Sequence, residues 1–127
     1  DAETHSKLSQ PLITPASMLP EKLRNELGKK KLFDFGLKVS SDRFEFYEKS
    51  CIIPNSLVLS YALAVCVSGK MSRILLAGFD GYPNEDPRND EVEKIIRDFS
   101  KTGFENSLVS ITPTRFKGLL IKSIYGF

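Results

Sequence analysis

The chain has 127 residues, 41% of them hydrophobic and 27% charged, which is the size and composition of one folded domain. Eighteen lysines and arginines against sixteen acidic residues leave a net charge of +2, with residues 29–31 as the only dense basic run. This balance argues against a nucleic-acid-binding protein. The longest apolar stretch, Leu57–Val67, is too short to span a bilayer, and no segment has the pattern of a secretory signal. We therefore expect a cytoplasmic domain that contacts neither nucleic acid nor membrane.

The cysteines and the histidine indicate no metal chemistry. Cys51 and Cys66 lie in apolar surroundings without the paired spacing of a zinc site, and His5 is the only histidine. We expect both cysteines to be core residues in a reducing compartment. Neither a GxGxxG nor a GxxxxGK[ST] motif occurs, so no cofactor is expected. Residues 1–10 are interpreted as a linker or the end of a preceding element, and residues 11–127 as a single α/β domain.

The first third of the domain is predicted to alternate strand and helix. Residues 11–16 indicate a short strand, and Ser17 is expected to cap a helix that carries Leu19, Leu23 and Leu27 at intervals of four and ends at Gly28. Residues 30–39 predict a second strand with Gly36 as a possible bulge. Residues 40–50 leave three possibilities open, a short edge strand, a helical turn around 44–47, or a loop. We favour the loop or the short helix.

The middle of the chain predicts the centre of the fold. A brief strand at 51–53 is followed by a helix over 56–69, whose residues are apolar on almost every side and which ends at Gly69. Arg73–Phe79 is a continuous apolar run of the length expected for a central parallel strand covered on both faces. We therefore expect this strand to lie in the middle of the sheet.

The last third repeats the alternation. A helix is predicted from Pro87 to Gly103, with Val92, Ile95 and Phe99 on its apolar face, followed by a strand at 107–114 and an edge strand in the final ten residues. Alternating helices and apolar strands are typical of right-handed βαβ units. The fold class is therefore predicted as a three-layer α/β/α domain with a mainly parallel sheet of about 4–5 strands.

Ligands of such sheets bind at the carboxyl ends of the strands, where the helix N-termini converge. Four loops are expected at that edge: residues 14–17, 54–56, 80–91 and 112–115. The strongest candidate is the loop after residue 79, where an acidic side chain, a glycine and an aromatic ring follow one another. The candidate ligand-binding residues are Asn55, Ser56, Gly78, Asp80, Gly81, Tyr82, Arg88, Thr112, Thr114 and Arg115.

Two interpretations of this polar loop stay open. Asp80 can accept hydrogen bonds from ligand hydroxyls, and Arg88 can meet a carboxylate or phosphate. Alternatively, Asp86 caps a helix that starts at Pro87, and the acidic residues after it only complement the helix dipole. Asp86, Asp90 and Glu91 are weak candidates for a metal site. No catalytic residue can be assigned, since a Ser-His-Asp or Cys-His set cannot be built.

Two segments carry a family resemblance: IPNSLVLSYALAVCVSGKMSRILLAGFDGYPNEDPRNDE at 53–91 and SLVSITPTRFKG at 107–118. Over residues 11–127 the chain resembles the C-terminal Rossmann-like domain of HMG-CoA-lyase-like bacterial aldolases from surface-polysaccharide clusters. The helix followed by Gly78-Phe79-Asp80-Gly81-Tyr82 is also similar to Campylobacter-type sialyltransferases. The first resemblance implies an aldolase barrel upstream in the parent chain. The second implies a nucleotide-sugar-like pocket near Asn55 and Gly78–Tyr82, without a counterpart of that group's catalytic histidine.

From these observations we expect an accessory domain of an aldolase that binds a polar sugar, keto acid or nucleotide-type ligand at the carboxyl edge of the strands, and that is not itself catalytic. An alternative is a glycosyltransferase-like or nucleotide-sugar enzyme in which Asp80 acts as base or metal ligand. A further alternative is a pure interaction module, which predicts an exposed apolar patch.

Overall fold

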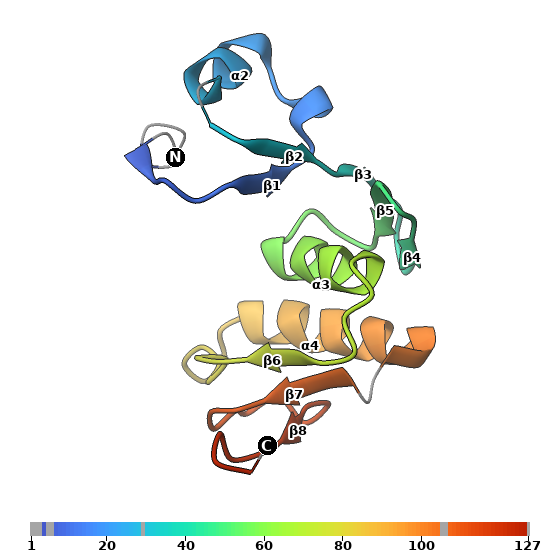
Figure 1. The fold of residues 1–127 in the computed structure, drawn as a ribbon. Helices are drawn as coiled ribbons and strands as arrows, with labels where there is room; N and C mark the ends of the chain where they lie inside the picture. The colour runs from blue at the N-terminus through green and yellow to red at the C-terminus, as the bar shows by residue number, and fades with distance from the viewer. Residues whose placement is uncertain (1–3, 5–6, 29, 105–106, 127) are drawn as a thin grey trace.

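Short strands and three α-helices make up the fold in the computed structural model, which describes residue 4 and residues 7–28, 30–104 and 107–126. The elements are β1 (Leu12–Thr14), the 3-10 helix η1 (Ala16–Met18), α2 (Glu21–Leu27), β2 (Leu32–Asp34), β3 (Gly36–Val39), β4 (Glu45–Phe46), β5 (Ser50–Ile53), α3 (Val58–Ser68), β6 (Ile74–Leu76), α4 (Arg88–Phe99), the π-helical segment η2 (Ser100–Phe104), β7 (Leu108–Ser110) and β8 (Leu120–Ile121), as Figure 1 shows.

The strands form three small sheets instead of one. β1 pairs with β2 in parallel, β5 lies between parallel β3 and antiparallel β4, and β6, β7 and β8 form a third sheet that is parallel throughout. The α/β class and the mainly parallel pairing are as the sequence predicts. The predicted sheet of about 4–5 strands is not formed, because no sheet within the described residues has more than three strands.

The break between the first two sheets lies at Phe35, inside the segment predicted as one strand. The Phe35 N–H donates to the Thr14 carbonyl at 3.0 Å, whereas the next N–H, of Gly36, donates to the Lys49 carbonyl at 2.9 Å. The chain therefore changes its pairing partner between these two residues. Gly36 is not a bulge but the first residue of β3, and Phe35 turns into the core.

The first helix begins later than predicted. Ser17 lies in η1, where its N–H and its hydroxyl both lie near Asp34 Oδ1, at 3.2 and 3.4 Å. Helix α2 starts only at Glu21, after Pro20, whose fixed φ suits the position before a helix. Ser17 thus ties η1 to the end of β2 and does not cap α2.

Residues 40–50 form no helical turn, and within a segment that is mostly loop they contain the short edge strand β4, the alternative that we did not favour. Glu45 pairs with Ile52 and Phe46 with Cys51 in an antiparallel hairpin. The aromatic side chains of the hairpin anchor it to α4, because the rings of Phe44 and Phe46 both pack against Phe99 of that helix.

Helix α3 lies at the centre of the molecule, between the β3–β5–β4 sheet and α4 (Figure 1). Leu63 and Val67 enter the larger hydrophobic cluster with α4 and the third sheet, and Ala64 enters a smaller one with Cys51 and Ile53 of β5. Burial raises the pKa of the Cys51 thiol to about 11. Cys51 is thus a core residue, as expected, and Cys66 is partly buried against the larger cluster.

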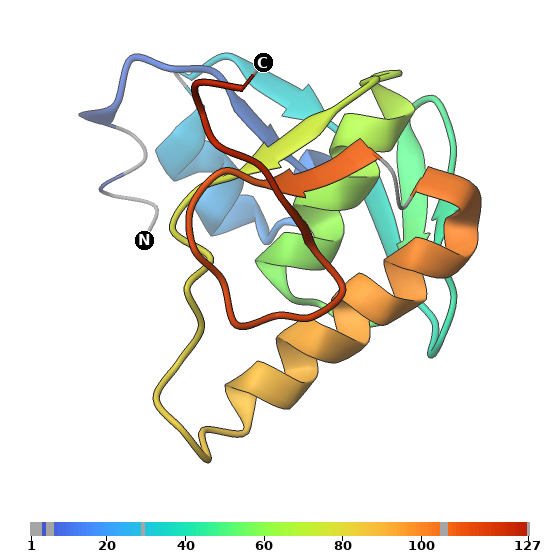
Figure 2. The same cartoon turned by 90° about the horizontal axis from the view of Figure 1, so that it is seen from below.

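The third sheet differs most from the prediction. β7, not β6, is its central strand, because β8 joins the other side of β7. In the register, Leu75, Val109 and Leu120 lie on one face, and the outer two are 47% and 52% exposed. Helix α4 lies on the opposite face. Figures 1 and 2 show that the C-terminal segment, which contains no helix, crosses the face that carries Leu75, Val109 and Leu120. Within the described residues this sheet therefore has a helical layer on one face only.

No helix in the described part of the chain has the length and apolarity needed to cross a membrane.

Candidate functional site

The exits of β6 and β7 lie side by side, as expected for the carboxyl ends of neighbouring parallel strands. The Ile111 N–H donates to the Leu76 carbonyl at 2.9 Å, and just beyond this bond the Gly78 N–H donates to Thr112 Oγ1 at 3.0 Å. The structure therefore brings together two of the four predicted loops, those at 80–91 and 112–115.

Arg115 links these two loops. Its backbone N–H donates to the Asp80 carbonyl at 3.4 Å, and its guanidinium donates to the Tyr82 carbonyl and to Asn84 Oδ1. Gly81 allows this close approach, because its φ is +100° and a Cβ there would lie 2.2 Å from Arg115 Cδ. The guanidinium that we expected to meet an acid on a ligand is thus engaged within the protein.

Asn89, in the first turn of α4, holds the loop from its other side. Its Oδ1 accepts the Tyr82 N–H at 2.9 Å, and its Nδ2 donates to the carbonyls of Tyr82 and Pro83 at 3.3 and 3.1 Å. Sequence reasoning missed this residue, since an exposed-looking asparagine in a polar helix start gives no distinguishing signal. Tyr82 is therefore fixed through both of its backbone groups.

The capping interpretation describes Asp86. Its Oδ1 accepts the Arg88 N–H at 3.0 Å, and its carboxylate pairs with the Arg88 guanidinium, with Oδ2 and Nη2 2.7 Å apart. The side-chain and backbone hydrogen bonds from Arg88 lower the pKa of Asp86 to about 2. The same guanidinium lies 4.0 Å from the centre of the Tyr82 ring. Arg88 is thus also engaged within the protein.

The structure does not support the weak metal candidates. Within the described residues, no group of three or more histidine, cysteine, aspartate or glutamate side chains is arranged to hold an ion. Asp86, Asp90 and Glu91 therefore form no such group, and the first turn of α4 carries the latter two as acidic residues at its dipole.

Two adjacent hollows open beside the fixed loop. One, of about 220 Å³, is lined by Gly78, Phe79, Gly81, Tyr82, Val92 and Phe116. The other, of about 310 Å³, shares Phe79, Tyr82 and Val92 with it and adds Arg88, Glu91, Ile95 and the chain at 57–59. We call these two hollows the Tyr82 site. Phe79, Val92 and Phe116 were not among the predicted site residues, because an apolar residue that lines a hollow has the same pattern as one in the core.

Asp80 is next to the Tyr82 site in the chain but lines neither of its hollows. It follows Phe79 and precedes Gly81, which both line the smaller hollow, and its own side chain is exposed. Among the residues that the structure describes, no hydrogen bond or ion pair engages the Asp80 carboxylate. It is thus the charged candidate at this edge that remains available to a ligand.

The other predicted residues lie outside the two hollows, and two of them make hydrogen bonds that stabilise the fold. Asn55 Oδ1 accepts the Leu57 N–H at 3.1 Å and the buried Ser60 hydroxyl at 2.8 Å, which fixes the start of α3. Ser56 is exposed and lines neither hollow. Thr114 Oγ1 accepts the Phe116 N–H at 3.2 Å. The loop at 14–17 belongs to the separate β1–β2 sheet, so the four predicted loops do not converge on one point.

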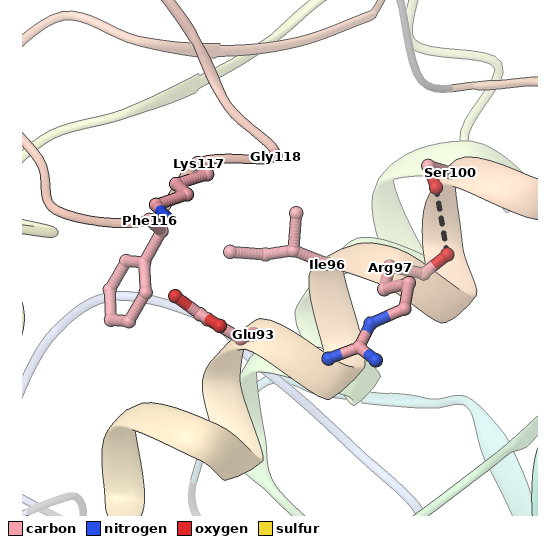
Figure 3. Close-up of a pocket in the computed structure, with 7 residues that line it drawn as sticks. All are labelled: Glu93, Ile96, Arg97, Ser100, Phe116, Lys117 and Gly118. Atoms are coloured by element: carbon pink, nitrogen blue, oxygen red, sulfur yellow. Dashed lines mark hydrogen bonds between the residues drawn. The ribbon is translucent and has the colours of Figure 1, made fainter.

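A further hollow, of about 290 Å³, lies on the outer face of α4, where the loop at 116–118 passes over the helix (Figure 3). Its lining includes Phe116, which also lines the smaller hollow of the Tyr82 site, and none of the predicted site residues.

No protein-family model, no curated protein and no solved structure matches this chain.

Proposed function

We propose that this chain is a non-catalytic accessory domain that binds a small polar ligand at the Tyr82 site. The observation that supports the proposal is the way Tyr82 is held. Asn89 and Arg115 bind both of its backbone groups, the Arg88 guanidinium lies over one face of its ring, and the residue lines both hollows. A ring presented rigidly beside a hollow is a feature of pre-formed ligand sites.

Among the ligand classes considered, a sugar fits this site best. Its apolar face can stack on Tyr82 and Phe79, and its hydroxyls can donate to the exposed Asp80 carboxylate, which lies between two lining residues in the chain. A keto acid or a nucleotide would need a free cation, but Arg88 is paired with Asp86 and Arg115 is bound to the loop. The smaller hollow lies below the range of about 300–1,000 Å³ typical of drug-sized ligands, which favours a monosaccharide unit.

The polar groups around the site support binding over catalysis. Asn89, Thr112 and Arg115 are each bonded to the loop backbone. Groups committed in this way hold geometry and do not exchange protons with a substrate. The resemblance to HMG-CoA-lyase-like aldolases supports an accessory role beside an upstream barrel, and a Rossmann-like ancestry for the parallel β6–β7–β8 sheet with α4. Reading the coding sequence upstream of Asp1 tests that role, since a barrel is expected there.

Calorimetric titration with monosaccharides, CMP, UDP-sugars and 2-keto acids tests the ligand. We expect saturable binding of a sugar that Tyr82→Ala weakens about tenfold, since the variant removes an apolar contact surface that contributes about 1.5 kcal/mol. Tyr47→Ala, which removes a tyrosine outside the site, is the matched control. Absence of binding by any of these compounds would remove the proposal. Turnover of a sugar nucleotide that Asp80→Asn abolishes would favour the glycosyltransferase-like alternative.

Two exposed leucines on either side of the buried Val109, on the helix-free face of the third sheet, favour a second function, an interaction module. Leu75 and Leu120 lie on the face that carries no helix in the described chain, and both are about half exposed. If this face docks on the rest of the parent protein, the double variant Leu75→Gln, Leu120→Gln should release the domain from a separately expressed barrel while ligand binding stays unchanged. Undiminished association would exclude that role for this face.

A further inference from the structure

Three ionisable side chains surround the hollow between α4 and the loop at 116–118. Glu93 and Arg97 project from α4, and Lys117 comes from the loop (Figure 3). No hydrogen bond or ion pair engages any of these three side chains in the part of the chain that the structure describes. The other lysines of this region differ, because Lys94 pairs with Asp42 and Asp98, and Lys101 pairs with Asp98.

The unpaired state of Glu93 and Arg97 is informative. A glutamate four residues before an arginine is the favoured spacing for an ion pair on a helix surface. Here the two side chains form no pair, although both line the same hollow. Their charges therefore remain available at the two sides of the hollow.

The floor of the hollow is apolar and closely packed. Ile96 points from α4 toward the loop, and a Cβ on Gly118 would lie 2.8 Å from Ile96 Cγ2. Phe116 is buried beside them. An apolar floor lowers the local dielectric and strengthens the attraction between a bound anion and the cations at the rim.

We propose that this hollow binds a small carboxylic acid that also carries a hydroxyl or ammonium group. Arg97 and Lys117 receive the carboxylate, the guanidinium through its fork and the ammonium as a point charge. Glu93 accepts the hydrogen bond of the hydroxyl or ammonium group, and the carbon chain lies on Ile96 and Phe116. This acid site shares Phe116 with the Tyr82 site but uses different charged groups, because both guanidinium groups of the Tyr82 site are engaged within the protein.

Amide NMR spectra during titration with L-lactate and L-alanine test the proposal, with lactamide and alaninamide as probes that lack the carboxylate. We expect saturable shifts of the amides at 93–97 and 116–118 with the two acids and none with the two amides. Arg97→Gln and Lys117→Gln should each weaken binding about tenfold, because each removes a charge-assisted contact. The natural competing explanation for Arg97 is that a cation in the last helical turn only complements the dipole.

Arg24→Gln is the matched control, because Arg24 occupies the last turn of α2 as Arg97 does that of α4. It should leave acid binding unchanged. The proposal fails if the acids cause no saturable shifts, if the amides bind equally well, if sodium chloride at equal ionic strength gives the same shifts, or if the Arg97 variant binds like the Arg24 variant. Each of these outcomes leaves the test of the Tyr82 site unaffected.

Discussion

Both the backbone conformation and the neighbouring side chain of Arg115 favour glycine at position 81. Its φ of +100° disfavours any L side chain, and a Cβ would overlap Arg115. Gly81→Ala should therefore displace Arg115 from the Tyr82 carbonyl. We expect a loss of unfolding free energy of about 2–4 kcal/mol in urea denaturation, from the backbone conformation and from the lost hydrogen bonds together.

Gly103→Ala is the control for the backbone part of that effect. Gly103 also has a positive φ, of +85°, but nothing lies within 4 Å of its ideal Cβ. It should cost only about 1–2 kcal/mol. Equal losses in the two variants would mean that the contact with Arg115 contributes nothing to stability.

The Asp86–Arg88 pair predicts a pH dependence. Hydrogen bonds from Arg88 lower the folded-state pKa of Asp86 to about 2, from an ordinary value of 3.8. A lowered pKa means that the stabilisation is complete above about pH 4 and is lost as the pH falls toward 2. Carboxyl-carbon NMR should show the Asp86 titration midpoint near 2, rising toward the ordinary value in Arg88→Gln. An unchanged midpoint in that variant would contradict the pairing.

Sequence reasoning at this scale selected the two loops that the structure brings together but not the contacts that their residues make. Three candidates that we chose at the end of an apolar run line the smaller hollow, namely Gly78, Gly81 and Tyr82. Arg88 and Arg115 were interpreted as ligand contacts, because a guanidinium in a polar loop has the same pattern whether its partner is a ligand or the loop itself. Only the three-dimensional partners, Asp86 and the Tyr82 carbonyl, distinguish the two cases.

At the scale of elements, the start of α3 tests whether Asn55 caps a helix or binds a ligand. Asn55→Ala removes the acceptor of the Leu57 N–H and leaves the buried Ser60 hydroxyl without a partner. We expect a loss of about 1–2 kcal/mol in thermal or urea unfolding, with ligand binding at the Tyr82 site unchanged. Ser56→Ala, next to it but exposed, should change stability by less than about 0.5 kcal/mol. A loss of binding without a loss of stability in Asn55→Ala would support the ligand interpretation instead.

Helix α4 was predictable because its apolar residues recur at helical spacing, and α3 because a long segment that is apolar on almost every side ends at a glycine. The short elements were harder to predict. β4 has only two residues, and its aromatic side chains suit a helical turn as well as a strand until Phe99 is known to lie beneath them. The division of 30–39 into β2 and β3 depends on two distant partners, β1 and β5, which no local pattern contains.

At the scale of the whole molecule, Phe99 connects separate sheets. Its fully buried ring packs edge-on against Phe44 and Phe46 of the hairpin, and it belongs to the core cluster that includes β6 and β7. Phe99→Ala should cost about 3–5 kcal/mol. Hydrogen exchange at Ile53 and Val109 should then accelerate together, because both sheets lose one shared support.

Phe33→Ala is the control for Phe99→Ala. Phe33 is an aromatic residue that is 47% exposed, so its truncation should have a much smaller effect. Faster exchange at only one of the two amides, Ile53 or Val109, in the Phe99 variant would show that the sheets are stabilised independently.

The order of the strands could not be predicted from local sequence either, because it depends on pairing between segments that are distant in the chain. An apolar run such as Arg73–Phe79 has the pattern of a strand buried on both faces, but its place in the sheet depends on where β8 pairs. β8 adds to β7, which leaves β6 at the edge and its Leu75 half exposed. Total composition indicates one α/β domain, whereas the division into three sheets follows from contacts between segments far apart in the chain.

The central claim is that a ligand binds at the Tyr82 site. The most direct measurement is an amide NMR titration of the intact chain with the sugar that binds best in calorimetry. Saturable shifts should be centred on Gly78, Gly81 and Tyr82 and should disappear in Tyr82→Ala, while the amides of Leu12–Thr14 in the separate β1–β2 sheet stay unchanged. Shifts that saturate with the same midpoint in Tyr82→Ala, or that are confined to other parts of the chain, would contradict it.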